Sequence, residues 1–255
     1  MRPATREEFE VAIICALPHE ADAVEASFDE TYDSQSRYYG KRSGDTNVYV
    51  NVWAKEASQL SRRIPGWVTP ALVAGICGAV PVSRERIKIS LGDIIISDSL
   101  IEYDFGRQYP DGFQRKSDAK STLGRPSREI RTILSSLQTA EIGDQFRERI
   151  HYHLKALQAQ KPVWRDPSTS SHEHTDEPLR GTDSSTLQGG VDEDTTRPLV
   201  HIGTMASGDT VMKSDRHRNR LAHVEGIIGF EMEGAGVWDS FPCLIIKGVC
   251  DYADS

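Results

Sequence analysis

Ile227-Ile-Gly-Phe-Glu-Met-Glu-Gly-Ala-Gly-Val-Trp238 and Leu244-Ile-Ile-Lys-Gly-Val-Cys-Asp-Tyr-Ala-Asp-Ser255 are the two stretches that decide the expected fold. They begin with apolar runs of strand length, Ile227–Phe230 and Leu244–Val249, and each run leads into acidic residues. Strands buried on both faces of a parallel sheet read as continuous apolar runs. Ligands of open α/β sheets bind beyond the carboxyl ends of such strands. The pattern therefore predicts an α/β protein with acidic side chains at one rim of its sheet.

Three carboxylates fall at this predicted rim. Glu231 and Glu233 follow the first run, and Asp251 follows the second. Polar residues also stand where ordinary strands meet solvent, and for a single carboxylate the two interpretations are about equal. Three carboxylates beside the small residues Gly234-Ala-Gly236 favour a ligand site.

The composition limits the class of protein. The 255 residues suit one large α/β domain, although two small domains would also fit. A hydrophobic content of 38% and a mean hydropathy of −0.47 are low for a compact enzyme, which indicates that part of the chain is not packed. The net charge of −8 argues against a nucleic-acid binder or a protein of anionic membranes, because phosphate backbones require basic stripes.

The sequence also predicts the compartment. No apolar run approaches the roughly 20 residues that span a bilayer, and the charged N-terminus is unlike a signal peptide. The four cysteines stand singly in apolar segments, without zinc-ligand spacing. We therefore expect free thiols in the cytoplasm. No cofactor or metal is expected, since His172 and His174 lie in a polar stretch where histidines are usually solvated.

Two motifs resemble those of a known superfamily. Phe230-Glu-Met-Glu-Gly-Ala235 and Gly248-Val-Cys-Asp-Tyr-Ala-Asp-Ser255 are similar to signatures of the purine nucleoside phosphorylase/nucleosidase superfamily. They look most like the nucleoside-phosphorylase-like domains that begin many fungal immune-receptor-type proteins. The resemblance implies one domain over residues 8–255, with three α/β/α layers around a central mixed, twisted, partly barrel-like sheet. It also implies a homo-oligomer that takes a purine nucleoside or nucleotide.

The resemblance assigns roles to the acidic residues. Asp251 would protonate the departing base, and burial would favour the protonated form that this requires. Glu233 would bind the ribose hydroxyls with Met232 against the sugar, and Glu231 is a supporting candidate. Glu20 would activate water, although by itself it reads as a carboxylate that favours a helix N-terminus.

Other residues would line the same pocket. Ala71–Ala79 is expected to be a strand that ends in a small-residue turn, where backbone and ligand can approach closely. The resemblance gives the base and ribose pocket to its end and to the later Ser-Gly-Asp turn. The residues concerned are Gly75, Cys77, Gly78, Ser207, Val211 and Met212.

Two segments that contain basic residues can each be interpreted in two ways. The aromatic segment Tyr103–Phe113 could cover a purine by stacking while Arg107 reaches a phosphate, or it could be a surface loop with its aromatics packed inward. The basic run 216–220 reads as a solvated helix face or as a seat for phosphates. The Gly-rich turn that the family carries near residues 50–66 is not recognisable here.

The remaining pattern completes the expected fold. Ser127–Leu137 and Ile142–Leu157 show the apolar spacing of helices on a sheet. Residues 158–197 are rich in Ser, Thr, Asp, Glu, Gly and Pro, and we expect a disordered insertion within the domain.

Cleavage of an N-glycosidic bond requires a protonated base, a stabilised sugar cation and a nucleophile. Asp251, Glu233 and Glu20 would divide these tasks. An acidic Asp251 side chain favours adenine over a 6-oxo base, and a carboxylate at Glu20 suits water better than phosphate. The sequence thus predicts a nucleosidase that releases adenine. The alternatives are a phosphate-dependent phosphorylase and a non-catalytic purine-nucleotide sensor of a larger receptor-like protein.

Overall fold

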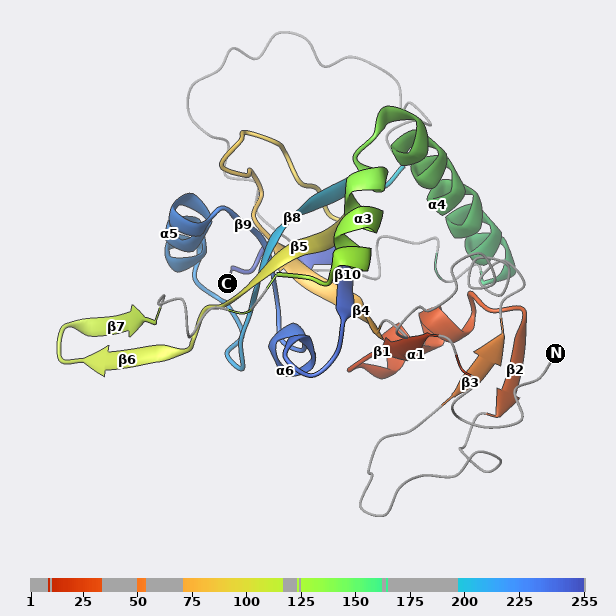
Figure 1. Cartoon of the computed structure of the whole chain (residues 1–255). Helices are drawn as coiled ribbons and strands as arrows, with labels where there is room; N and C mark the ends of the chain where they lie inside the picture. The colour runs from red at the N-terminus through yellow and green to blue at the C-terminus, as the bar shows by residue number, and fades with distance from the viewer. Residues whose placement is uncertain are drawn as a thin grey trace, which may run out of the picture.

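A six-stranded sheet forms the centre of the computed structural model, which describes residues 9, 11–33, 50–53, 71–116, 123, 125–161, 164 and 197–254. In spatial order the strands are β1 (Ala12–Ile14), β4 (Ala71–Ala79), β10 (Cys243–Asp251), β5 (Ile94–Glu102), β8 (Val200–Ser207) and β9 (Ile227–Glu231). Figure 1 shows how these strands cross one another at the centre of the molecule.

The sheet is mixed and closes on itself. β1 and β10 run parallel to β4, and β5 runs antiparallel to β10. β8 runs parallel to both β5 and β9. Closure comes from β9, which pairs antiparallel with the end of β4 through Gly78 opposite Phe230 and Ala79 opposite Gly229. Neither Gly78 nor Ala79, the two β4 residues that pair with β9, carries a bulky side chain. The expected mixed, partly barrel-like sheet is confirmed.

The core fills the interior of this closed sheet. Val73, Ile95, Met205 and Ile245 come from different strands and are fully buried together. Apolar residues that alternate along twisted strands meet in such an interior because closure turns one face of every strand inward. Gly229 belongs here for a steric reason, since a Cβ at this position would lie 2.9 Å from the Ile95 Cδ1 atom.

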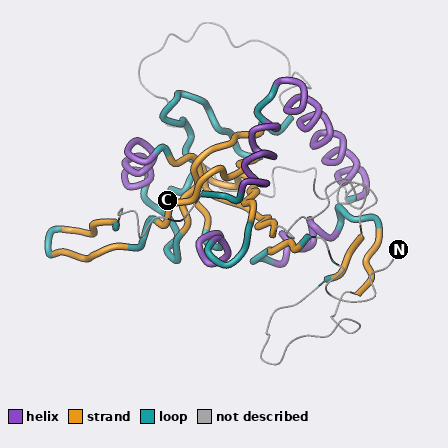
Figure 2. The backbone as a smooth tube through the Cα atoms, in the orientation of Figure 1, coloured by secondary structure: helices purple, strands orange, loops and turns teal. Residues whose placement is uncertain are grey.

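Helices cover the sheet on more than one side (Figure 2). The helices are α1 (Pro18–Glu25), α3 (Arg128–Leu137), α4 (Ala140–Gln160), α5 (Asp215–Glu225) and α6 (Gly234–Trp238). α3 begins where the Ser127 hydroxyl accepts the Ile130 amide, and it buries Ile130 and Leu134 with Ile96 and Leu244 of the sheet. α5 ends at Gly226, whose φ of 71° is the left-handed conformation of a helix C-terminus.

The segment Tyr103–Phe113 is a hairpin rather than an irregular loop. β6 (Gly106–Tyr109) and β7 (Gly112–Arg115) pair with each other, and the hairpin projects from the body of the molecule (Figure 1). The exposed side chains of Phe105, Tyr109 and Phe113 do not pack inward, which corrects one of the two interpretations offered above. Only Tyr103, before the hairpin, is buried, and its ring meets Phe230 edge to face with centroids 5.7 Å apart.

Element boundaries follow the expected ones closely in most places. β2 (Glu30–Asp33), which pairs with β3 (Asn51–Trp53), was not expected. α4 continues to Gln160, into the range expected to be an insertion, and most of the rest of 158–197 lies outside the described residues. Among the residues that the structure describes, no helix has the length and apolarity to cross a membrane.

Truncation of a core side chain tests this architecture. Ile95→Ala should lower the free energy of unfolding by about 2–5 kcal/mol, because Ile95 is 0% exposed inside the closed sheet. Ile87→Ala removes the same atoms from a side chain that is 48% exposed, and should change it by less than about 0.5 kcal/mol. Urea denaturation measures both, and similar losses for the two variants would contradict this placement of the core.

Candidate active site

The carboxyl end of β4 is where the acid-bearing strands meet. Gly78 is paired with Asp251 of β10 on one side and with Phe230 of β9 on the other. Because β10 is parallel to β4 and β9 is antiparallel to it, the two acidic motifs do not share the rim of a parallel sheet, as the sequence pattern suggested. They converge because β9 crosses the end of β4 when the sheet closes.

Glu20 is fixed against the same strand. It lies buried in the first turn of α1, where its Oε2 atom accepts the amides of Ala16 and Leu17 at 3.0 and 2.9 Å. Its Oε1 atom accepts the Ile76 amide of β4 at 2.8 Å. The carboxylate fits only because Gly75 has no side chain, since a Cβ there would lie 2.2 Å from Oε1. Glu20 thus caps its helix, as the simpler interpretation held, and also reaches the end of β4.

Glu231 is a buried carboxylate that organises the start of α6. Its two oxygens accept the amides of Glu233 and Gly234 at 2.9–3.1 Å. The Ser207 side chain also hydrogen-bonds Glu231, and its Oγ atom accepts the Ala235 amide at 3.0 Å. Burial raises the pKa of the Glu231 carboxyl, against the lowering effect of the Ser207 hydrogen bond and of a nearby lysine. Glu231 therefore holds Glu233 in place through the backbone.

That lysine, Lys247, is a central residue that the sequence reasoning missed. Its side chain is 1% exposed, and its Nζ atom donates to Glu233 Oε2 at 2.7 Å and lies 3.7 Å from Glu231 Oε2. Lys247 is paired in register with Gly75, the residue that makes room for Glu20. The signal was present in the sequence, because a single cation inside the apolar run Leu244–Val249 requires buried counter-charges.

Asp251 sits where β10 leaves the sheet. Its Oδ1 atom accepts the Ala253 amide at 2.7 Å, and the Cys250 thiol lies 3.8 Å from Oδ2. A Cβ at Gly78 would come within 2.6 Å of Oδ1. Oδ1 is therefore held by a backbone amide, whereas Oδ2 meets only the weak thiol donor of Cys250, and the side chain is partly exposed.

The residues expected to frame the base lie along the neighbouring turn. Ser207 and Met212 are buried, whereas Val211 is exposed. Met232, which was expected to lie against the sugar, is exposed between β9 and α6. The turn after Ser207 is held by Asp104, whose Oδ2 atom accepts the amides of Asp209 and Thr210 at 2.7 and 3.1 Å.

The thiols near the site have raised pKa values. The Cys77 side chain is buried in the core, and burial raises the pKa of its thiol. Burial also raises the pKa of the Cys250 thiol to about 11, and Cys250 donates to the Cys77 carbonyl oxygen at 3.4 Å. Of Cys77, only the backbone is therefore suited to face a ligand. No group of three or more His, Cys, Asp or Glu side chains that could hold a metal occurs within the described part of the chain.

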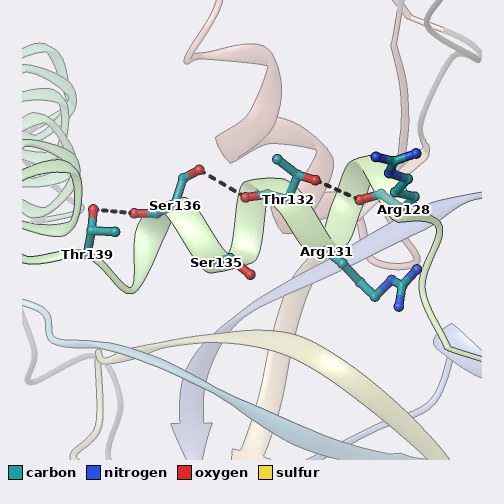
Figure 3. A pocket seen from close by; sticks show the side chains of 6 residues that line it. All are labelled: Arg128, Arg131, Thr132, Ser135, Ser136 and Thr139. Atoms are coloured by element: carbon teal, nitrogen blue, oxygen red, sulfur yellow. Dashed lines mark hydrogen bonds between the residues drawn. The ribbon is translucent and has the colours of Figure 1, made fainter.

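Arg107 is not brought to the carboxylates. It lies exposed on β6, in the projecting hairpin (Figure 1). A separate hollow of about 470 Å³ runs along the outer face of α3 and is lined by none of the expected site residues (Figure 3). Its lining residues are Arg128, Arg131, Thr132, Ser135, Ser136 and Thr139.

The sequence of this chain is similar to those of known proteins, and the similarity is consistent with the observed fold. No protein-family model matches the chain. The chain aligns over 98% of its length, at 27% identity, with a nucleotide-binding leucine-rich repeat (NLR)-like protein of Hyaloscypha variabilis, of which it spans only 27%. It is 24% identical over 95% of its length to a 5'-methylthioadenosine/S-adenosylhomocysteine nucleosidase of Mycobacterium bovis, of which it covers 86%.

Solved structures show the same architecture. The nucleosidase of this type from S. pneumoniae, solved with a transition-state inhibitor, has a TM-score of 0.50 at 18% identity. A Borrelia burgdorferi protein assigned the same activity, solved with adenine, also has a TM-score of 0.50, at 14% identity. Each match covers 96% of this chain and 87% of the other. The fold that the resemblance implied is thereby confirmed.

Removal of the buried ammonium group tests the charge balance of this site. Lys247→Met leaves Glu231 and Glu233 without their cation, and the free energy of unfolding should fall by about 3–5 kcal/mol near neutral pH. Lys155→Met, on the exposed side of α4, should have little effect.

The pH dependence of this loss has a definite sign. Without Lys247 the pKa of Glu231 rises further, so folded protein holds its proton where the unfolded chain has released it. The free energy of unfolding of the variant then falls as the pH rises above the pKa that Glu231 has in the unfolded chain. The loss caused by Lys247→Met should therefore be smaller at about pH 5 than at about pH 8. Denaturation at the two pH values measures it, and a pH-independent loss would argue against a buried, ionised Glu231.

Proposed function

We propose that the chain is a purine nucleosidase, which hydrolyses the N-glycosidic bond of adenine nucleosides or nucleotides and releases adenine. The observation that carries this proposal is the arrangement of acidic groups along β4: Glu20 accepts the Ile76 amide, and Asp251 is paired with Gly78. Lys247, which is paired with Gly75, donates to Glu233. Residues 8–255 would form one such domain, with an insertion at 158–197. We place it in the cytoplasm as a homo-oligomer.

The sugar would be held by Glu233. Its side chain is 28% exposed, and its Oε2 atom accepts the Lys247 ammonium group at 2.7 Å. A carboxylate is a suitable acceptor for the paired hydroxyls of a ribose, and its negative charge stabilises an oxocarbenium-like sugar. The exposed Met232 side chain adjoins it in the sequence and would lie against the sugar.

The base would be protonated by Asp251. Because the Ala253 amide already occupies Oδ1, the second oxygen is the one that would carry a proton to the purine. The turn after Ser207, held by Asp104, and the buried Met212 would frame the ring, with Val211 at its edge. The backbone near Gly75, Cys77 and Gly78 would form the facing wall.

Water is a better nucleophile than phosphate for this arrangement. The Glu20 carboxylate is held in place by three backbone amides and would orient a water molecule. Phosphate would meet the negative charges of Glu20, Glu231 and Glu233. Among the described residues around these carboxylates, the cation is Lys247, and it is already engaged by Glu233. These charges favour hydrolysis over phosphorolysis.

The relatives support the same class of reaction. Proteins named as nucleosidases of adenine thioether nucleosides align with nearly all of the chain. A purine-nucleotide sensor is the second candidate, because an NLR-like relative is several times longer than this chain. The sensor would bind adenine nucleotide without cleavage.

Adenine release from a panel of substrates tests the proposal. Wild-type protein should release adenine from at least one of adenosine, AMP, ATP and methylthioadenosine, whether or not phosphate is present. The second product should be the sugar with a hydroxyl at its anomeric carbon and its 5'-substituent retained, which for adenosine is ribose. Asp251→Asn cannot donate a proton and should lower kcat by about 10²–10⁴-fold. Chromatography measures the released adenine. With adenosine as substrate, identification of the sugar product as ribose or as ribose-1-phosphate distinguishes hydrolysis from phosphorolysis.

Asp22→Asn is the matched control, since Asp22 lies exposed on α1 and should not affect release. Sugar phosphate formed only with phosphate would identify a phosphorylase instead. Tight binding of adenine nucleotide without any release would identify the sensor.

A further inference from the structure

The loop that follows β10 is tied to α5 by a buried arginine. Arg218 is 5% exposed, although it belongs to the basic run expected to face solvent or substrate phosphates. Its Nη1 atom donates to the Tyr252 carbonyl oxygen and, at 2.9 Å, to Asp254 Oδ2. Its Nε atom donates to the Asn219 side chain at 3.1 Å. The guanidinium group therefore spans both sides of residue 253.

The residue between these two anchors has an unusual conformation. Ala253 has a φ of 53°, the left-handed region that non-glycine residues seldom adopt. Its side chain is buried with Tyr103, Met212 and Phe230, so the conformation is fixed from the core side as well. Such conformations persist only when the surrounding structure determines them.

The conformation of Ala253 matters because its amide orients Asp251. In this conformation the Ala253 amide donates to Asp251 Oδ1 at 2.7 Å. Gly78 leaves the space for both, since a Cβ there would lie 2.6 Å from that oxygen and 2.8 Å from the Ala253 Cβ atom. A chain of contacts thus runs from Arg218, through residues 252–254, to the carboxylate.

We infer that Arg218 is a positioning residue for Asp251: it holds residues 252–254 so that the second carboxylate oxygen is aimed at the departing base. This inference rests on the proposed nucleosidase function. Arg218 touches no reacting atom in this scheme. The sugar-side groups Glu20, Glu233 and Lys247 are held from α1, β4 and α6, by contacts that do not include Arg218.

A misplaced acid has a specific kinetic signature. Adenine departs easily only when it is protonated, so its release depends on the aim of Asp251. A nitrophenolate departs as a stable anion and does not need a proton from the enzyme. Loss of positioning should therefore slow the release of adenine much more than the release of nitrophenol from the same sugar.

Arg218→Met tests this signature. With the adenine substrate, kcat should fall by about 10²-fold, the size expected when a catalytic group is slightly misplaced, and KM should change little. With 4-nitrophenyl riboside, kcat should stay close to that of wild type. Arg218→Lys should recover much of the adenine activity, because an ammonium group can donate to both the Tyr252 carbonyl and Asp254. Arg131→Met, which removes an exposed arginine of α3, should match wild type with both substrates.

Hydrogen exchange gives a readout that does not depend on activity. The amides of residues 251–254 should exchange faster in Arg218→Met than in wild type or Arg131→Met, while those of β4 and β5 are unchanged. In Arg218→Lys these amides should exchange at a rate between those of wild type and Arg218→Met. If Arg218→Met does not fold, the comparison is made between Arg218→Lys and wild type.

The inference is overturned if the Arg218 variants keep full adenine activity, or if they lose activity equally with both substrates. Unchanged exchange at residues 251–254 would also overturn it. Absence of adenine release by wild type would remove the proposed function, and the exchange comparison would still decide whether Arg218 holds the loop.

Discussion

The contact on which the site depends is the buried ion pair between Lys247 and Glu233, with Glu231 close behind. An ammonium group inside a protein is unfavourable unless carboxylates and hydrogen-bond acceptors surround it closely. This requirement fixes the start of α6, since Glu231 accepts the amides of Glu233 and Gly234 while facing the same cation. It also leaves the region with net negative charge, because Glu20 lies against Gly75, the residue with which Lys247 is paired. A site of this charge suits a cationic sugar and a water molecule.

Two glycines of β4 make the convergence sterically possible. Gly75 admits the Glu20 carboxylate against the backbone, and Gly78 admits Asp251 and Ala253. At each glycine, the space that a side chain would fill is occupied by a group from another element. The β4 side of the site is therefore formed by backbone atoms. The small residues of this strand are thus explained by what approaches them. The closure of the sheet by β9 at Gly78 brings the motif that contains Glu231 and Glu233 to the same place.

Much of this arrangement was predictable from the sequence, and the rest depended on long-range contacts. The strand Ala71–Ala79 was predicted with its observed bounds, because its apolar residues and flanking small residues are local signals. The mixed sheet came from the family resemblance. Lys247 was missed because its partners are set by register between distant segments. The basic run that contains Arg218 was assigned to a solvated or phosphate-binding face, because its local sequence says nothing of Tyr252 and Asp254.

The most direct test of the central claim is a crystal structure of the protein with a non-hydrolysable adenine nucleoside analogue. The account predicts that the sugar hydroxyls contact Glu233, that the purine lies against Asp251, and that Glu20 faces the anomeric carbon through a water molecule. An analogue bound elsewhere, for example in the hollow along α3, would contradict it. So would a bound nucleoside that left any of these three carboxylates out of reach of the glycosidic bond.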